Sequence, residues 1–572
     1  MRKTIALGAA IFGAASGIAC GGDGGGDLAS ADPFCQRVVP AVEAFMTQAR
    51  ADHPTPSDDR YGGTVVVGGA AELRGGMNSA GAVDYVSVQH HQFVNLMTLI
   101  DYDQDAEPRA YLAERWEVSE DVSEITFHLR QDVFWHDGEQ TDAHDVAFTY
   151  GLVTNPVVGF SNPAYWDHYE QGDQAVEVVD DFTIKIRMRP HVDFLDPWRT
   201  VGILPEHLLG DVPPDALGTH PFGSECPVGN GPFVFVSHTP QDRWVFTANT
   251  AFPQGLGGRP FLDRYIYRII GEQTTSLTEL LTESTDVYLS VPPDQAQRII
   301  DDPAVDLMHF RSRNFAFVAW NSRKPQLAAA EVRRALTLGT NRRAVIDAML
   351  HGYAGVANSG VPPLHWAFDR NLAALDEYDP QAAATLLEEA GWTDRNGDGV
   401  REDAEGTPLT ISVKYRSGAQ LQKGIVEIMQ SELGQIGVDL RPEAVEWTTL
   451  IRQTFNVARD FDGLIMQYAV DYRLDDTDSF HSARSDVGSA LSGTSDQELD
   501  RLLERLSAAP DREAAQPLWT QYQRVLNEVH PYTFLYFPER IHGISKRLRA
   551  VEMDARAEFL NIKDWHLDPA SR

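Results

Sequence analysis

Helical and strand-like segments alternate along most of this chain, with glycines at several of the boundaries. The segment from Gln422 to Ile436 repeats apolar side chains at helical spacing and leads through Gly437 into the strand-like run 438–440. The runs 124–130 and 181–188 instead alternate apolar and polar residues, as half-buried strands do. This alternation of the two periodicities predicts an α/β chain built from mixed sheets. Helical spacing also predicts a helix over 331–350.

The length and the net charge of the chain limit the classes of protein to which it can belong. At 572 residues the chain is long enough for several structural units. Its 83 acidic residues outnumber 48 basic ones and give a formal net charge of -35. A surface this acidic repels the phosphates of nucleic acids, so we expect no nucleic-acid partner.

The first twenty residues have the pattern of an export signal. Arg2 and Lys3 precede an uncharged stretch from Ile5 to Ala19, which is too short to span a bilayer. Cys20 follows, ahead of a glycine-rich run, and this arrangement resembles a bacterial lipoprotein signal, although Gly17 stands where that signal usually carries Leu. The resemblance implies that residues 1–20 are the signal peptide and that the thiol of Cys20 receives the lipid. The alternative is ordinary cleavage and full release, and in both cases the protein is exported.

Residues 21–60 are rich in Gly, Asp, Ala and Pro, and we expect a flexible tether there that includes one short helix over 37–50. Apart from Cys20, the sequence holds only Cys35 and Cys226. Two thiols in an oxidising compartment can pair, so a disulfide between them is one expectation and two unrelated cysteines the other.

Sequence motifs for catalysis are absent. The sequence contains no HExxH, GxSxG, Walker loop or Cys-x-x-Cys, and the histidine pairs at 90–91 and 136–144 do not fit the spacing of metal ligands. We therefore expect that the protein is not an enzyme and that it requires no cofactor.

One loop matches the template of a calcium site. The ligand positions of this template fall on oxygen-bearing residues and on one backbone carbonyl, and the twelfth position is a glutamate. The positions are Asp394, Asn396, Asp398, Val400 and Glu405. A strand-like run follows instead of the second helix of an EF-hand, and the same residues also make a metal-free turn. The two readings are a structural Ca²⁺ site and a plain turn.

Ordered blocks of sequence carry a resemblance to a known family. The blocks are 111–121, 125–138, 141–150, Gly229–Phe235, 260–263, Phe317–Asn321, 332–336, 378–392 and Ala469–Tyr472. Together they resemble the family 5 extracellular solute-binding proteins, the peptide- and oligopeptide-binding receptors of bacterial ABC importers. The matches run in order over roughly residues 62–550, so a chance resemblance is improbable.

The resemblance implies a two-lobed fold like the type II periplasmic binding proteins, α/β with mixed sheets, paired hinge strands and an extra subdomain. Lobe one is then expected over 61–310 and 535–572, with the subdomain at about 86–195, and lobe two over 311–534. The lobes close around a solute by hinge bending, and the closed form docks on a membrane permease.

The resemblance also suggests where the ligand is held. Asp471 is expected to pair with the α-ammonium of a peptide, because the corresponding Ala-x-Asp-Tyr setting does so in peptide-binding members. Tyr472 and Trp320 are expected to serve core or hinge packing, with stacking on the ligand as the alternative. Arg416 and Arg473 are candidates for the carboxylate end by their charge and neighbourhood.

The leading hypothesis is an exported, lipid-anchored, monomeric receptor for short peptides that works with ABC permease subunits at a bacterial membrane, in the periplasm or at the cell surface. Within the family the alternative ligands are nickel complexes, opines and oligosaccharides. The alternative of another class is a secreted hydrolase that uses the same fold.

Overall fold

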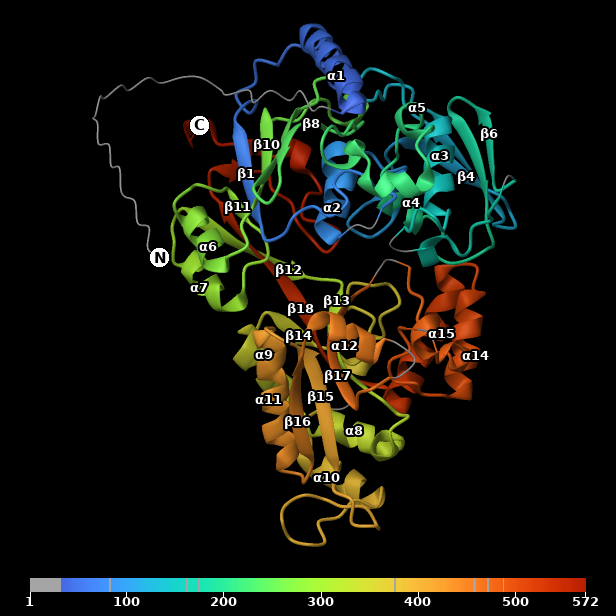
Figure 1. Cartoon of the computed structure of the whole chain (residues 1–572), viewed down its shortest axis with the longest axis vertical. Helices are drawn as coiled ribbons and strands as arrows, with labels where there is room; N and C mark the ends of the chain where they lie inside the picture. The colour runs from blue at the N-terminus through green and yellow to red at the C-terminus, as the bar shows by residue number, and fades with distance from the viewer. Residues whose placement is uncertain are drawn as a thin grey trace, which may run out of the picture.

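The computed structural model describes residues 32–571, apart from the short segments 82–83, 161–162, 173, 375–376, 456–458, 471–472 and 487. The predicted signal peptide and Cys20 lie outside the described residues. Two lobes are stacked along the long axis of the molecule, with the labels β1 and β10 in one and β15 and β16 in the other (Figure 1). Among the described helices, none is both long and apolar enough to cross a membrane.

A single twelve-stranded sheet runs through both lobes, in the order β16-β15-β17-β13-β18-β11-β1-β10-β9-β8, and β12 and β14 also pair with β18. β1 pairs in parallel with β10 and β11, while β8, β9 and β10 are antiparallel, so the sheet is mixed, as the sequence predicts. The strands of lobe one are β1 (Thr64–Gly69), β8 (Phe233–Thr239), β9 (Arg243–Ala248), β10 (Arg264–Ile269) and β11 (Val287–Tyr288). Its helices α6 (Gln273–Leu281) and α7 (Ala296–Ile300) lie beside β11 and β12.

Two segments carry the chain between the lobes. The first is β12 (Val305–Arg311) followed by β13 (Asn314–Trp320), and the second is the fourteen-residue strand β18 (Tyr532–Ser545). The start of β18 pairs with β13 and its end pairs with β12. Pro538, which has no N–H to donate, lies between these two ladders. Paired crossing strands of this kind are suited to act as a hinge.

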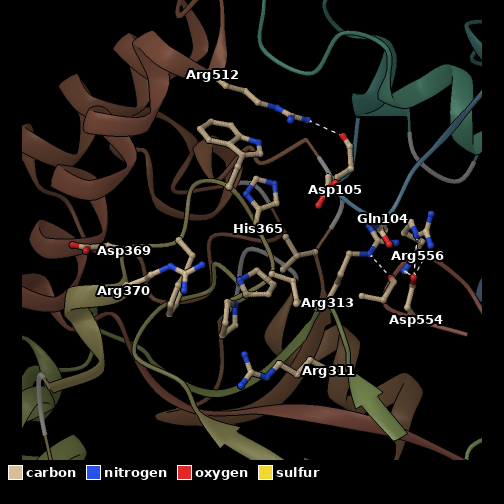
Figure 2. Close-up of a pocket in the computed structure, with 18 of the residues that line it drawn as sticks. Gln104, Asp105, Arg311, Arg313, His365, Asp369, Arg370, Arg512, Asp554 and Arg556 are labelled. Carbon is tan, nitrogen blue, oxygen red and sulfur yellow. Dashed lines mark hydrogen bonds and ion pairs between the residues drawn. The ribbon is translucent and has the colours of Figure 1, made fainter. Parts of the chain in front are cut away.

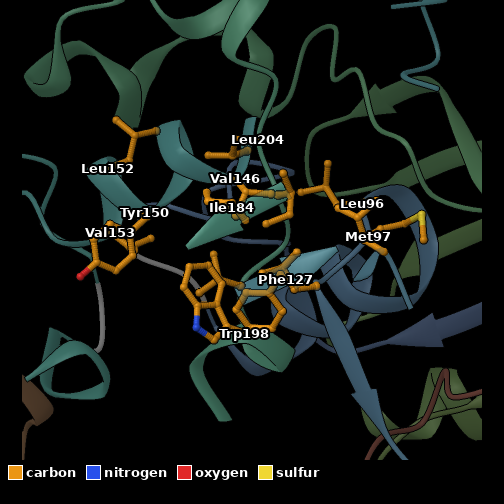
Figure 3. Packing of buried hydrophobic residues seen from close by; sticks show 14 of the residues in the cluster. Leu96, Met97, Phe127, Val146, Tyr150, Leu152, Val153, Ile184, Trp198 and Leu204 are labelled. Carbon is orange, nitrogen blue, oxygen red and sulfur yellow. The ribbon is translucent and has the colours of Figure 1, made fainter. Parts of the chain in front are cut away.

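A subdomain inserted into lobe one has its own sheet and core. Its sheet has the order β4-β5-β7-β6, with β4 (Ala113–Val118), β5 (Glu124–Leu129), β6 (Val176–Asp180) and β7 (Thr183–Arg187). Along β5 the residues Ile125, Phe127 and Leu129 are buried and their neighbours are not, which is the alternation seen in the sequence. Phe127 packs edge-on against Trp198, with ring centroids 5.7 Å apart (Figure 3).

Helix α3 (Ala143–Val153) of the subdomain begins directly after the capping residue Asp142. The Asp142 side chain accepts hydrogen bonds from the backbone N–H groups of His144 and Asp145, and the Asp145 side chain accepts one from the Asp142 N–H. This reciprocal capping satisfies N–H groups that have no partner inside the helix. The helix places Val146, Tyr150, Leu152 and Val153 in the subdomain core (Figure 3).

Lobe two packs helices on the remaining strands of the large sheet. The strands are β13, β14 (Ala354–Val356), β15 (Thr410–Arg416), β16 (Asp439–Val445) and β17 (Gly463–Ala469). The helices are α8 (Ala330–Leu338), α9 (Arg342–Leu350), α10 (Pro380–Glu389), α11 (Gln420–Gly434), α12 (Trp447–Thr454), α13 (Thr477–Phe480), α14 (Gln497–Ser507) and α15 (Arg512–Val529).

The single helix predicted over 331–350 is wrong, because α8 ends at Leu338 and α9 begins at Arg342. The Asn341 side chain accepts a hydrogen bond from the Ala344 N–H and so caps the second helix. Gly339 follows α8 where a Cβ atom would come within 2.7 Å of Leu433 Cδ2 on α11. Both helices contribute to the same core, and periodicity alone does not reveal the break between them.

Residues 33–52 form helix α1 (Pro33–Asp52), which contains the short helix expected over 37–50 and corrects the expectation that the rest of this segment is a flexible tether. Cys35, Val38, Met46 and Ala49 are buried on one side of this helix. A disulfide joins Cys35 to Cys226, with Cα atoms 5.6 Å apart, and so fixes α1 to lobe one. Glycine and alanine in the segment suggested a tether, but burial of this apolar face stabilises the helix.

Candidate functional site: a cavity between the lobes

A cavity of about 780 Å³ lies between the two lobes (Figure 2). Lobe one contributes residues 104–106, 310–311 and 554–556, and lobe two contributes the loop 362–371 and the start of α15. The volume falls within the range of about 300–1,000 Å³ that is usual for small-molecule sites. Since both lobes form its walls, the shape of the cavity depends on how the two lobes are arranged.

The cavity walls come from elements whose positions are fixed locally. Asp511 caps α15 by accepting a hydrogen bond from the Ala514 N–H at 2.8 Å. Arg512, Gln516 and Thr520, which follow at intervals of four residues, therefore share the helix face that borders the cavity. On the opposite side, residues 104–106 connect the short strands β2 (Ile100–Tyr102) and β3 (Pro108–Ala110).

The cavity is cationic although the protein as a whole is strongly acidic. Among the described residues, five arginines and three aspartates line it: Arg311, Arg313, Arg370, Arg512, Arg556, Asp105, Asp369 and Asp554. A cleft with an excess of positive charge attracts anionic groups and raises their local concentration. The presence of both signs also suits a ligand that carries both.

Three of these arginines are held by protein groups. Arg556 pairs with Asp554, with Nη2–Oδ2 at 2.7 Å, and donates from Nη1 to the Tyr102 carbonyl oxygen at 3.0 Å. Arg313 donates from Nε to the Ala555 carbonyl oxygen at 3.1 Å. Arg512 pairs with Asp193 outside the cavity wall. These three charges are partly compensated before any ligand arrives.

Arg311 and Arg370 differ from the other three. Both side chains line the cavity, both residues are exposed, and neither guanidinium makes an ion pair or hydrogen bond with another described residue. Arg311 ends β12 on the lobe-one side, and Arg370 lies in the loop of lobe two. Two uncompensated cations on opposite walls are available to an anionic group of a ligand.

A contact between the subdomain and lobe two closes one side of the cleft. Arg512 Nε donates to Asp193 Oδ1 at 2.8 Å, and Trp366 Nε1 donates to Asp193 Oδ2 at 3.1 Å. Burial raises the pKa of Asp193, and this effect outweighs the opposing attraction of Arg512. One buried carboxylate of the subdomain therefore receives two donors from lobe two.

The ligand-binding residues proposed from sequence differ in where they lie relative to the cavity. Asp471 and Tyr472 lie outside the described residues, but their neighbour Val470 lines the cavity. Arg473 forms a second contact between lobe two and the subdomain, because its backbone N–H donates to Asp196 Oδ2 at 3.0 Å and its Nη1 to the Tyr165 carbonyl oxygen at 3.4 Å. The Arg473 guanidinium thus bonds to the subdomain and forms an ion pair with Asp475 at 3.2 Å. The sequence instead makes Arg473 a candidate for binding the carboxylate end of a ligand.

Trp320 and Arg416 do not line the cavity. Trp320 takes the core position expected of it, whereas the candidate role of Arg416 at the carboxylate end of the ligand is corrected. Trp320 is fully buried in the core of lobe two and donates from Nε1 to Thr533 Oγ1 at 2.9 Å. Arg416 is exposed at the end of β15 and is not part of the cavity wall. From sequence, an apolar strand residue such as Trp320 and a charged residue such as Arg416 could lie in the core, on the surface or on the cavity wall. Only the tertiary structure distinguishes these locations.

The loop with the calcium-like spacing keeps two of its predicted carboxylates together. Oxygens of Asp394, Asp398 and Glu402 lie within 4.8 Å of one another. Asn396 donates from Nδ2 to Asp398 Oδ2 at 3.0 Å, and the Val400 N–H donates to Asp398 Oδ1 at 2.8 Å. The third carboxylate of the cluster is Glu402, whereas Glu405, at the twelfth position of the motif, is exposed.

The cavity arginines and the Asp193 contact were missed at the level of sequence. Arg512 and Asp193 are 319 residues apart, and neither belongs to a recognisable motif. Asp193 has an unusual positive φ of 56°, but a backbone dihedral angle cannot be read from the sequence.

The fold and the site together define a binding protein that closes two lobes around a small solute. The family model of the bacterial extracellular solute-binding proteins, family 5, matches residues 107–489, which is more than half of the chain. The chain therefore belongs to this family and is a solute-binding component of an ABC transporter, in agreement with the prediction from sequence. Members of the family are extracytoplasmic substrate-binding proteins.

Two characterised relatives show the extent of the likeness. The chain is 26% identical over 444 residues to the oligopeptide-binding protein AppA of Bacillus subtilis, covering 77% of this chain and 80% of AppA. It is 26% identical over 477 residues to the dipeptide-binding protein of Escherichia coli, covering 79% of this chain and 85% of that protein.

Solved structures confirm the two-lobed α/β fold predicted from sequence. The structure of Bacillus subtilis AppA in complex with a nonapeptide superposes with a TM-score of 0.74 at 24% identity, covering 89% of this chain and 99% of AppA. NikZ of Campylobacter jejuni in complex with Ni(L-His) superposes with a TM-score of 0.72 at 24% identity, covering 88% of this chain and 99% of NikZ.

Proposed function

We propose that this protein captures short peptides in the cavity between its lobes and delivers them to a membrane permease. The observation that carries the proposal is the charge of the cavity wall, where five arginines and three aspartates face a space of about 780 Å³. A free peptide carries a cation at one end and an anion at the other, and so matches walls of both signs. Relatives named for peptide binding support the same ligand class.

The carboxylate end of the peptide is assigned to Arg311 and Arg370. Their guanidinium groups have no partner among the described residues, so a carboxylate gains charge-assisted hydrogen bonds without displacing an existing ion pair. Arg313, Arg512 and Arg556 already bond to protein groups and contribute mainly to the field of the cavity.

The α-ammonium end is assigned to Asp471. The support is its place in the Ala-x-Asp-Tyr segment and the position of its neighbour Val470 on the cavity wall. Asp105, an exposed carboxylate on the wall opposite the lobe-two loop, is the comparison residue for this assignment.

Mass spectrometry of ligand that co-purifies from the native host tests the proposal directly. We expect intact peptides of a few residues. A nickel complex, an opine or an oligosaccharide in their place would overturn the peptide assignment and leave the solute-binding class intact. Incubation with a peptide mixture provides a second test, because a receptor returns intact peptides, whereas a hydrolase on the same fold would return fragments.

We further propose that the protein is a monomeric lipoprotein anchored through Cys20. The glycine-rich residues that follow Cys20 would let the lobes approach a permease while the lipid stays in the membrane. Cys20→Ser should move the protein from the membrane fraction to the soluble fraction. A wild-type protein that is already fully soluble would contradict the anchor.

A further inference from the structure

We infer that lobe two holds a calcium ion between Asp394, Asp398 and Glu402. The three residues lie in the connection from α10 to β15, which Figure 1 places at the end of lobe two away from lobe one. The site is separate from the cavity, so the inference does not depend on which solute the cavity binds.

The spacing of the carboxylate oxygens fits one hard cation. One oxygen from each of the three residues lies within 4.8 Å of the other two. Oxygens that bind one calcium ion at about 2.3–2.6 Å can be at most about 4.6–5.2 Å apart, so a single ion can reach all three. The donor set contains oxygen only, which favours calcium over zinc, since zinc prefers nitrogen and sulfur ligands.

Glu402 supplies an independent indication that a cation is bound. It is only 4% exposed, and backbone pairing with Thr393 on one side and Pro408 on the other holds it in place. Its Oε2 accepts a hydrogen bond from the Arg395 N–H at 2.9 Å, but its Oε1 is buried without a hydrogen-bond partner among the described residues. A buried carboxylate oxygen without a partner is costly, and a cation removes that cost.

The neighbouring Arg395 does not neutralise the three carboxylates. The Arg395 guanidinium donates to the carbonyl oxygens of Glu402, at 2.9 Å, and of Asp403, instead of pairing with the three carboxylates. Asp394 accepts from the N–H groups of Gly397 at 2.7 Å and Gly399 at 3.1 Å, which shapes the loop around its carboxylate. Both glycines have positive φ, 80° and 92°, as a tight loop requires.

The structure therefore assigns a different third carboxylate from the one in the motif. The sequence template places the last ligand at Glu405, whereas the fold places Glu402 in the cluster. The difference arises because the loop closes by pairing Thr393 with Glu402 instead of continuing into a second helix. This gives a matched pair of glutamates, three residues apart, with which to test the site.

The test is calorimetric titration of CaCl₂ into the full exported chain after treatment with EDTA. We expect one site with a Kd of about 10⁻⁴–10⁻³ M, as in extracellular calcium-binding modules. Glu402→Gln should weaken binding by about tenfold or more, and Glu405→Gln should leave it within about twofold. Absence of binding heat, or equal losses for the two variants, would overturn the inference.

Two further measurements keep the result interpretable. Asp398→Asn, at an exposed position, should also weaken calcium binding by about tenfold, and it provides a second ligand variant if Glu402→Gln does not fold. Calcium should slow amide hydrogen exchange over residues 394–402 in the wild type. Magnesium that binds as tightly as calcium would overturn the assignment to calcium.

Discussion

Arg512 at the start of α15 and Asp193 in the subdomain form an ion pair across the two lobes, with Nε–Oδ1 at 2.8 Å. The Asp193 side chain is almost fully buried by this contact, and Arg512 remains partly exposed. Because the two residues belong to different lobes, the pair exists only while the lobes are together. The arrangement of the lobes in this structure is thus favoured by an interaction that is independent of the ligand.

Removing this ion pair is expected to weaken ligand binding by favouring the open form. Arg512→Gln removes a hydrogen bond to a charged group, for which a loss of about 1.5–3 kcal/mol is usual, or roughly 10- to 150-fold in affinity. Calorimetry measures the loss, and small-angle scattering should show a larger radius of gyration for the free variant.

Arg501→Gln is the control for this variant, since Arg501 is an exposed arginine of α14 whose ion pair, within the part of the chain that the structure describes, is with Glu498 on the same helix. It should change neither affinity nor radius of gyration. Equal effects of the two substitutions would show that net charge, and not the inter-lobe contact, controls closure.

Asp471→Ala is expected to weaken peptide binding by about 2–5 kcal/mol, or roughly 30-fold to several-thousand-fold, because it removes the partner of a buried ammonium group. N-acetylated peptides should bind the wild type poorly, and the variant should scarcely distinguish acetylated from free peptides. Calorimetry on the four combinations gives the coupling directly. If acetylation of the peptide is coupled to Asp105→Asn and not to Asp471→Ala, the α-ammonium group is to be assigned to Asp105.

Arg311→Gln and Arg370→Gln are each expected to cost roughly 10- to 150-fold in affinity for peptides with a free carboxylate, corresponding to about 1.5–3 kcal/mol. Peptides amidated at the C-terminus should bind the wild type more weakly than free peptides do. Their affinity should fall little further in either variant. Arg343→Gln, at an exposed position outside the cavity, is the control. Equal binding of amidated and free peptides to the wild type would contradict the assignment.

Buried histidines are expected to make the protein less stable in mild acid. Burial lowers the pKa of His90, His91, His136 and His542 to about 4. In the unfolded chain such groups take up protons near pH 6.5, so the native state is favoured above that pH and loses stability as the pH falls from about 6.5 to about 4. Each group contributes up to about 1.4 kcal/mol per pH unit.

Buried aspartates with raised pKa values, Asp193 among them, act in the opposite direction. Burial raises the pKa of Asp145 and Asp476 to about 6, so the native chain binds these protons first and gains stability as the pH falls from about 6 towards the ordinary aspartate range. Since the lowered histidines outnumber them, Tm should still fall between pH 6.5 and pH 5. His136→Gln should give a shallower decline than the wild type, and the exposed His144→Gln should not. A Tm that does not depend on pH in this window would contradict the prediction.

The sequence alone determined the class of this protein and much of its local structure. Alternating residues define β5, Asp142 defines the start of α3, and the ordered blocks define the family, because capping, strand periodicity and family motifs are local properties of the chain. The helix break between α8 and α9 was missed, since it depends on packing against α11.

Only the tertiary structure decided which side chains form the sites. The cavity takes Arg311, Arg370 and Arg512 from three distant parts of the chain, and the crossing strands β13 and β18 set the distances between them. Trp320 entered the core and Glu402 took the place of Glu405, because burial and pairing depend on neighbours that are remote in sequence or on how a loop closes. Local patterns specify segments, whereas a site depends on long-range contacts whose free energy is gained only when the segments pack together.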